Sequence, residues 1–224
     1  GISLADVDAI GIASPGIADH ETGVVEYSCN LPFRAFPVAR MLKELTGVAA
    51  VHVENDANAA AWGEAVAGAA RGTKSSVTIT LGTGVGGGTL MGLSKLLLHA
   101  ESIDHIVEYA DAGNLSNIDL LIKDMTAKDT LSELSADLTA ANFGNVSDIA
   151  SKSDIALGIL NMVFETIGMV SVFAARSVGV RNVVLTGNVT QFDFCKRKFD
   201  EINFIIPERS RFATVIGAAL RGMR

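Results

Sequence analysis

Cysteine is scarce in this sequence of 224 residues, and basic residues are outnumbered by acidic ones. Two cysteines, Cys29 and Cys195, are too few for a disulfide framework, which favours a reducing compartment. With 18 lysines and arginines against 25 acidic residues, the net charge of −7 argues against a nucleic-acid partner, which would require clustered basic side chains. The first residues do not form a signal peptide, and we expect a cytoplasmic protein.

Histidine is also sparse, and none of the four histidines forms a metal-ligand pattern with cysteine. His52 lies inside a predicted strand, while His99 and His105 lie in or near predicted helices. We therefore assign no cluster of metal-ligating side chains.

One apolar segment, residues 155–175 (IALGILNMVFETIGMVSVFAA), has the length of a transmembrane helix. Asn161, Glu165 and Thr166 lie in its middle, where an isolated glutamate is costly in a bilayer. The segment is therefore interpreted as a buried helix of a globular core, capped by Ser153, and no membrane partner is expected. A mean hydropathy of +0.35 likewise favours a well-buried core with an apolar subunit interface.

Segments typical of strands and helices alternate along the chain, which indicates parallel sheets and the α/β class. The expected strands are 7–16, the β-prone end of 19–28, 50–53, 76–81, 182–185 and 202–207. The expected helices are 36–47, 55–72, 91–100, 102–111, 116–125, 154–178 and 213–223, with a polar loop before residue 152. The weakest junction, Gly72–Ser75, predicts two lobes, 1–72 and 73–224.

Residues 81–93 (LGTGVGGGTLMGL) place five glycines between Gly82 and Gly88, directly after a strand and before a helix. Glycine lets a ligand approach the main chain, and free backbone N–H groups at a helix N-terminus bind anions. The pattern therefore favours a phosphate-binding loop, and the alternative is a tight turn with close packing. It matches neither the Walker P-loop nor the full dinucleotide fingerprint.

Polar residues also follow two other predicted strands. Glu54, Asn55 and Asp56 come after a buried strand and begin a helix, where a carboxylate could accept a hydroxyl proton. The alternative is that Asp56 or Asn55 merely caps the helix. The sequence LTGN, residues 185–188, is either a nucleotide contact or a plain turn. The residue pattern alone leaves both alternatives open.

Two families of kinases share motifs with this chain. Residues 1–88 resemble the ROK family of sugar kinases and repressors through GIASPGIAD, SCNLPF, VENDANAAAWGEAVAGAARG and TLGTGVGGG. Residues 87–224 resemble bacterial type II pantothenate kinases through GGTLMGLSKLLLHA, NIDLLIKDM, ANFGNV, DIALGILNMVFETIGMVSVFAARS, VVLTGNVTQF and FIIPERSRFATVIGAAL. The sequence resembles a join of the two families at a shared glycine stretch.

Both resemblances imply the actin-like, ribonuclease-H-like ATPase fold. They assign nucleotide binding to Gly82, Thr83, Gly84, Gly86, Gly87, Gly88, Gly187 and Asn188. They imply that Asp56 is the general base and that Asn30, Asn55 and Asp56 contact substrate. The first phosphate motif of the superfamily, Asp-x-Gly-Gly-Thr, is absent, so the N-terminal part is expected to be incomplete. The Gly-Glu-x-Gly-His and cysteine-rich zinc motifs of the sugar kinases are absent as well.

The resemblance implies an ATP-dependent kinase that uses Mg²⁺ and forms a homodimer. Pantothenate is the first expected substrate, because the pantothenate-kinase resemblance covers more of the chain. A hexose or amino sugar is the alternative, because the expected base belongs to the sugar-kinase part. A further alternative is a chain that has the fold without activity, since the first phosphate motif is absent. A sugar-sensing repressor would need a DNA-binding segment, and we recognise none.

Overall fold

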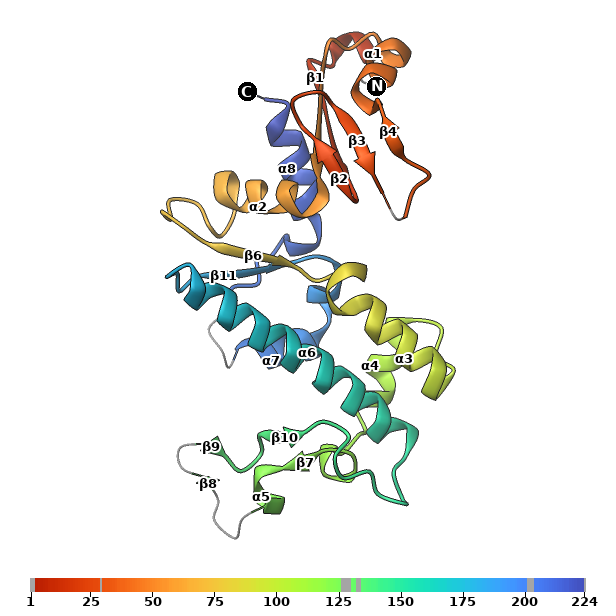
Figure 1. The fold of residues 1–224 in the computed structure, drawn as a ribbon, viewed down its shortest axis with the longest axis vertical. Helices are drawn as coiled ribbons and strands as arrows, with labels where there is room; N and C mark the ends of the chain where they lie inside the picture. Colours follow the sequence, from red (N-terminus) through yellow and green to blue (C-terminus); the bar gives the residue numbers. More distant parts are fainter. Residues whose placement is uncertain (1–2, 29, 126–129, 132–133, 201–203, 224) are drawn as a thin grey trace. The chain divides into compact units, whose positions relative to one another are not determined.

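The computed structural model describes residues 3–28, 30–125, 130–131, 134–200 and 204–223, and its architecture is mixed α/β, as expected (Figure 1). The chain forms two compact units. The first contains Gly1–Leu81 and Ser171–Arg224, and the second contains Gly82–Val170. The division into lobes 1–72 and 73–224 stays a prediction. Cys29 lies outside the described residues.

A parallel strand pair begins the first unit, after the single turn η1 (Leu4–Asp6). Strand β1 (Ala9–Ser14) pairs with β5 (Ala50–Asn55), and their last residues, Ser14 and Asn55, are register partners. Both strands read as apolar runs that end in polar residues, as buried parallel strands do. The parallel direction therefore brings polar side chains of distant sequence positions to one edge.

Three short antiparallel strands lie next to this pair. They are β2 (Ile17–Asp19), β3 (Val24–Tyr27) and β4 (Arg34–Phe36). Helix α1 (Val38–Thr46) follows and ends at Gly47, which has a φ of 75° and is the predicted stop. The strands and α1 share one buried apolar cluster, which contains Val25, Val38, Ala39, Val51 and Val53.

Two helices of the first unit, α2 (Asp56–Ala67) and α8 (Ala213–Arg221), cross with their backbones in contact (Figure 1). A Cβ at Gly63 would lie only 3.0 Å from the backbone nitrogen of Gly217. A Cβ at Gly217 would overlap the carbonyl oxygen of Ala59. The alanine-rich composition of α2 therefore serves close helix packing as well as helix propensity.

A second parallel pair joins β6 (Val77–Thr80) to β11 (Val183–Thr186). Ile205 adds a single bridge to Val184, so in the described residues the expected strand 202–207 is reduced to one bridge. The remaining elements are η4 (Asn188–Gln191), α7 (Asp193–Asp200) and η5 (Ser210–Phe212). Cys195 on α7 is a free thiol. Burial raises its pKa to about 12, although the charge of Lys196 opposes this shift, so the thiol is unreactive.

The second unit is built from helices and short strands. They are η2 (Thr83–Gly87), α3 (Gly88–Leu98), α4 (Ile103–Ala110), η3 (Leu115–Asn117), β7 (Leu120–Leu121), α5 (Ile122–Met125), β8 (Thr130–Leu131), β9 (Leu134–Ser135), β10 (Thr139–Ala141) and α6 (Lys152–Ser177) up to residue 170. The polar loop expected before residue 152 thus contains short strands. The helix expected over 116–125 is wrong, since β7 and the shorter α5 occupy that segment.

Buried hydrogen bonds explain this extended segment. The fully buried Asp119 carboxylate accepts the Phe143 backbone N–H at 2.8 Å and the Asn161 amide at 3.0 Å. The Asp124 carboxylate accepts the Leu121 N–H at 2.8 Å, at the start of α5. These contacts stabilise an extended backbone between residues 119 and 121, where the apolar pattern alone fits a helix equally well.

Helix α6 confirms the expected long helix, although it begins at Lys152 rather than after Ser153. Ser151 and Asp154 form reciprocal hydrogen bonds at its start, in the manner of a capping box. Hydrogen bonds to the Asp154 carboxylate, the strongest of them from the Ser151 N–H, outweigh the effect of burial and lower the pKa of Asp154 to about 2. The helix is long and apolar enough to cross a membrane, but 56% of its apolar window is buried within the protein, and we interpret it as a core helix.

Candidate functional site

The residues after β5 form a hydrogen-bonded junction between strand and helix. Asn55 is the N-cap of α2, and its side-chain oxygen accepts the N–H groups of Ala57 at 3.0 Å and Asn58 at 3.1 Å. Its side-chain amide donates to the Gly16 carbonyl at 2.8 Å. The cap therefore fixes the start of α2 and ties it to the turn after β1.

Asp56 is the first residue of α2 and is partly exposed. One oxygen of its carboxylate, Oδ1, accepts the Ala57 N–H at 2.9 Å and the Asn55 amide at 3.1 Å. The alternative that Asp56 or Asn55 caps the helix is therefore confirmed for Asn55, and Asp56 is not the cap. Within the described part of the chain, its other carboxylate oxygen accepts no hydrogen bond, and an oxygen of this kind can accept a proton from a ligand hydroxyl.

Asn30, the third residue expected to contact substrate, lies in an exposed bend between β3 and β4. Phe33 and Phe36 follow closely in the sequence, and their rings stack with centroids 4.4 Å apart. The role of Asn30 stays a prediction.

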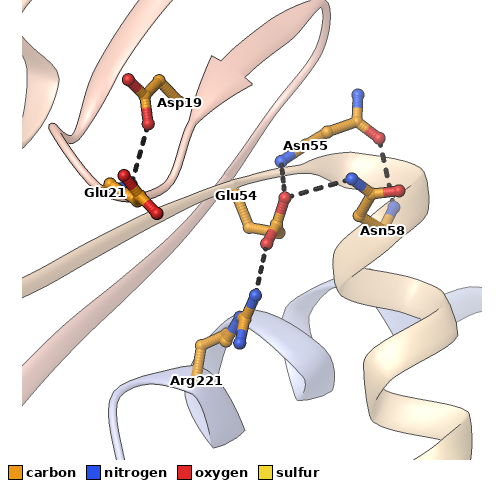
Figure 2. Close-up of polar contacts among 6 residues, drawn as sticks. All are labelled: Asp19, Glu21, Glu54, Asn55, Asn58 and Arg221. Atoms are coloured by element: carbon orange, nitrogen blue, oxygen red, sulfur yellow. Dashed lines mark hydrogen bonds and ion pairs between the residues drawn. The ribbon is translucent and has the colours of Figure 1, made fainter.

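Glu54 and Arg221 form a contact that reasoning from the sequence missed. The Arg221 guanidinium, on the last residue of α8, donates to Glu54 Oε2 at 2.9 Å across 167 positions of sequence. Glu54 Oε1 accepts the Asn55 N–H at 3.0 Å and the Asn58 amide at 3.2 Å (Figure 2). A carboxylate at the end of an apolar strand was the one available signal, because a buried charge requires partners.

The environment of Glu54 determines its ionisation. Burial raises the pKa, but hydrogen bonds from Arg221, Asn58 and Asn55, with the Arg221 charge, lower it by more, so the net pKa lies below the ordinary 4.5. Because the pKa of Glu54 is lower in the folded protein than in the unfolded chain, its ionisation stabilises the fold at pH values above the unfolded-state pKa. That stabilisation is lost as the pH falls through the folded-state pKa. Glu54 is therefore ionised at neutral pH.

Two hollows lie within the first unit. One of ≈ 180 Å³ is lined by His20, His52, Val53 and Arg221. Another of ≈ 390 Å³ is lined by Gly63, Glu64, Ala67, Gly68, Pro207, Glu208, Arg209 and Ile216. None of these residues is among those predicted for the site.

The glycine loop follows β6 after Leu81 and forms the wide turn η2, which leads into α3. The Gly87 N–H donates to the Gly82 carbonyl at 2.9 Å, and the Gly88 N–H donates to the Thr83 carbonyl. Gly86 has a φ of 85°, which other residues rarely adopt. The predicted order of strand, glycine loop and helix is therefore confirmed, with α3 beginning three residues earlier than expected.

The glycines of this loop differ in what their packing requires. A Cβ at Gly86 would lie 2.7 Å from Ile167 Cδ1, while one at Gly87 or Gly88 would lie 2.7 Å from a carbonyl oxygen of the loop itself. A Cβ at Gly82 or Gly84 would meet nothing within 4 Å. Packing therefore explains the last three glycines, as the alternative interpretation requires, but it does not explain the first two.

Gly187 follows β11 and has a φ of 98°. A Cβ there would overlap the carbonyl oxygen of Leu81, the residue that leads into the glycine loop. The Gly187 N–H donates to the Ser210 carbonyl at 2.9 Å, and Asn188 begins η4. The ends of β6 and β11 therefore lie together in the first unit, as parallel pairing requires.

The predicted site residues are divided between the two units. Asn30, Asn55, Asp56, Gly187 and Asn188 belong to the first unit, and Gly82–Gly88 belongs to the second. Among the residues that the structure describes, no group of three histidine, cysteine or acidic side chains is placed to hold a metal ion. Kinases usually hold Mg²⁺ with one or two carboxylates together with substrate phosphates, and the partly exposed Asp56 carboxylate is a ligand of that type.

Two family models match the chain. Residues 71–198 match the Fumble family, and residues 3–96 match the ROK family. The matches overlap over residues 71–96, which contain the whole glycine loop. This overlap agrees with the join expected from the sequence.

Curated relatives come from both groups of kinases. A glucokinase of Halalkalibacterium halodurans is 28% identical over 84% of this chain and 64% of its own length. A type II pantothenate kinase of Oceanobacillus iheyensis is 38% identical over 47% of this chain and 41% of its own length. The chain thus spans less than two thirds of these relatives.

Solved structures of ROK kinases share the fold, and these kinases have the actin-like ATPase fold. A ROK family glucokinase from Streptomyces griseus, in complex with glucose and AMPPNP, has a TM-score of 0.63 at 18% identity, covering 96% of this chain and 81% of that one. The ROK hexokinase from Thermus thermophilus has a TM-score of 0.51 at 25% identity, with coverages of 95% and 78%. The expected fold class is therefore confirmed.

Proposed function

Because the Fumble model matches more than half of this chain, the chain belongs to the Fumble family, and we propose that it is an ATP-dependent kinase acting on a small-molecule hydroxyl group. The observation that carries the proposal is the polar junction after β5, where an independent cap leaves the Asp56 carboxylate available. The glucokinase and pantothenate kinase relatives support a phosphoryl transfer reaction.

In this proposal Asp56 accepts the proton of the substrate hydroxyl, and Asn30 and Asn55 contact the substrate. The backbone of Gly82, Thr83, Gly84, Gly86, Gly87 and Gly88 binds the phosphates of ATP, and Gly187 and Asn188 bind its adenosine. When bound, Mg²⁺ neutralises phosphate charge. The open side of Gly84 supports this assignment, because a phosphate can approach the main chain only where no side chain intervenes.

Pantothenate is the first substrate proposed, because the type II pantothenate kinase relatives favour it. A hexose is the second, because Asn30, Asn55 and Asp56 all lie in the part matched by the ROK family. An ATP-consumption assay with pantothenate or glucose added separately tests both. ATP binding without transfer to either acceptor would favour the inactive-chain alternative. The homodimer stays a prediction.

Replacing Gly84 with valine is expected to abolish ATP binding while the protein stays folded. A valine side chain would fill the space that the phosphate needs, yet its Cβ meets no protein atom within 4 Å. Calorimetric titration with ATP measures the binding, and thermal unfolding provides the check on folding. ATP affinity equal to that of the parent would exclude this loop as the phosphate site.

A further inference from the structure

We propose that Arg221 is a positioning residue for the proposed base, acting through Glu54 and Asn55, an inference that rests on the kinase function above. Arg221 belongs to the last turn of α8, and Glu54 and Asn55 end β5. Arg221 donates to Glu54 Oε2, Glu54 Oε1 accepts the Asn55 N–H, and the Asn55 amide donates to Asp56 Oδ1. Four residues thus form one continuous line of hydrogen bonds, and Figure 2 shows three of them, Arg221, Glu54 and Asn55.

Burial makes the first contact consequential. The Glu54 side chain is 7% exposed, and that of Arg221 is 33% exposed. The Arg221 guanidinium also lies over the Trp62 ring, 4.9 Å from its centroid. Because Trp62 belongs to α2, the guanidinium is held by the same helix that begins at Asp56. Such a held, partly buried cation fixes the Glu54 carboxylate in one orientation.

Glu54 in turn determines the backbone at the cap. Its Oε1 atom accepts both the Asn55 N–H and the side-chain amide of Asn58, one turn along α2. An unpaired Glu54 would lack the guanidinium that offsets its burial, and it would then protonate or rotate toward solvent. Rotation removes the acceptor that orients Asn55, and protonation replaces it with a weaker, neutral acceptor. Either change loosens Asn55, and therefore the donor that orients Asp56.

The decisive comparison uses Arg221→Met and the double variant Arg221→Met with Glu54→Gln. Methionine retains an apolar stem over Trp62 but leaves Glu54 buried and unpaired. We expect turnover per folded molecule to fall about 10- to 100-fold, the scale set by small misplacements of reacting groups, with the KM for ATP unchanged. In the double variant, glutamine removes the buried charge and its Oε1 still accepts from Asn55 and Asn58, so turnover should largely return.

A second measurement does not depend on catalysis. Exchange of the Asn55 backbone N–H with solvent, followed by NMR, should be faster in Arg221→Met and should return toward the parental rate in the double variant. If the parent transfers no phosphate, the proposed function fails, yet this exchange still tests the positioning. An Arg221→Met protein that melts earlier but keeps parental turnover and exchange, or a double variant with no recovery of either, would overturn the inference.

Discussion

Replacing Asp56 with asparagine is expected to remove phosphoryl transfer while leaving the protein folded and able to bind ATP. A positioned carboxylate that accepts the hydroxyl proton contributes ~10²–10⁴-fold in rate, and asparagine cannot act as a base. The amide oxygen of asparagine can still accept the Ala57 N–H and the Asn55 amide, so the junction keeps its hydrogen bonds. Steady-state kinetics with the active acceptor, with the melting temperature measured in parallel, tests this.

Asn55→Ala provides the matched contrast one residue earlier. It removes the cap of α2 and the bond to Gly16, so it should lower stability by about 0.5–2 kcal/mol. Asp56→Asn should lower turnover with little change in stability, whereas Asn55→Ala should lower both. Parental turnover in Asp56→Asn would exclude Asp56 from the mechanism.

Local signals in the sequence were sufficient for the strand–loop–helix units that carry the candidate site. A strand followed by polar or glycine residues and then a helix was predicted at β5 and β6, and a strand with a glycine turn was predicted at β11; each occurs at that place. Parallel pairing then brings the ends of β1 and β5 to one edge and those of β6 and β11 to another. Alternation of strands and helices predicts such pairing, because parallel strands need crossover connections.

Contacts between residues far apart in the sequence could not be predicted from local sequence patterns. Glu54 and Arg221 are 167 positions apart, and no local pattern connects them. The antiparallel strand β4, of three residues, and helix α7, of eight residues, are short and were missed. The error over 116–125 has the same origin, since the hydrogen bonds of Asp119 to Phe143 and Asn161 override a short apolar run that fits helix or strand.

The glycines also show what a sequence leaves undecided. The loop Gly82–Gly88 allowed either a phosphate site or tight packing, and the structure shows that packing accounts for Gly86, Gly87 and Gly88 but not for Gly82 and Gly84. Gly63 and Gly217 drew no attention in the sequence, because a glycine within a helix marks no turn. Their importance comes from the crossing of α2 and α8, which depends on the tertiary fold.

Gly217→Ala should destabilise the first unit strongly, although alanine is the better helix former. The new Cβ would overlap the carbonyl oxygen of Ala59, a backbone atom of α2 that cannot rotate away. The helices must then separate, and overpacking of this kind typically costs about 1–3 kcal/mol. Because α2 begins at Asp56, its displacement should also lower the proposed activity. Denaturant unfolding, with activity measured on the folded fraction, tests both effects.

Gly92→Ala is the matched control, because Gly92 is also inside a helix, α3, but a Cβ there meets nothing within 4 Å. Alanine at this position should increase stability by about 0.5–1 kcal/mol through helix propensity alone. The same substitution therefore has opposite expected signs at the two sites, and only contact with a neighbouring backbone distinguishes them. Stabilisation by Gly217→Ala would mean that α2 and α8 do not cross at the distance the structure shows, and that the position of Asp56 does not depend on this crossing.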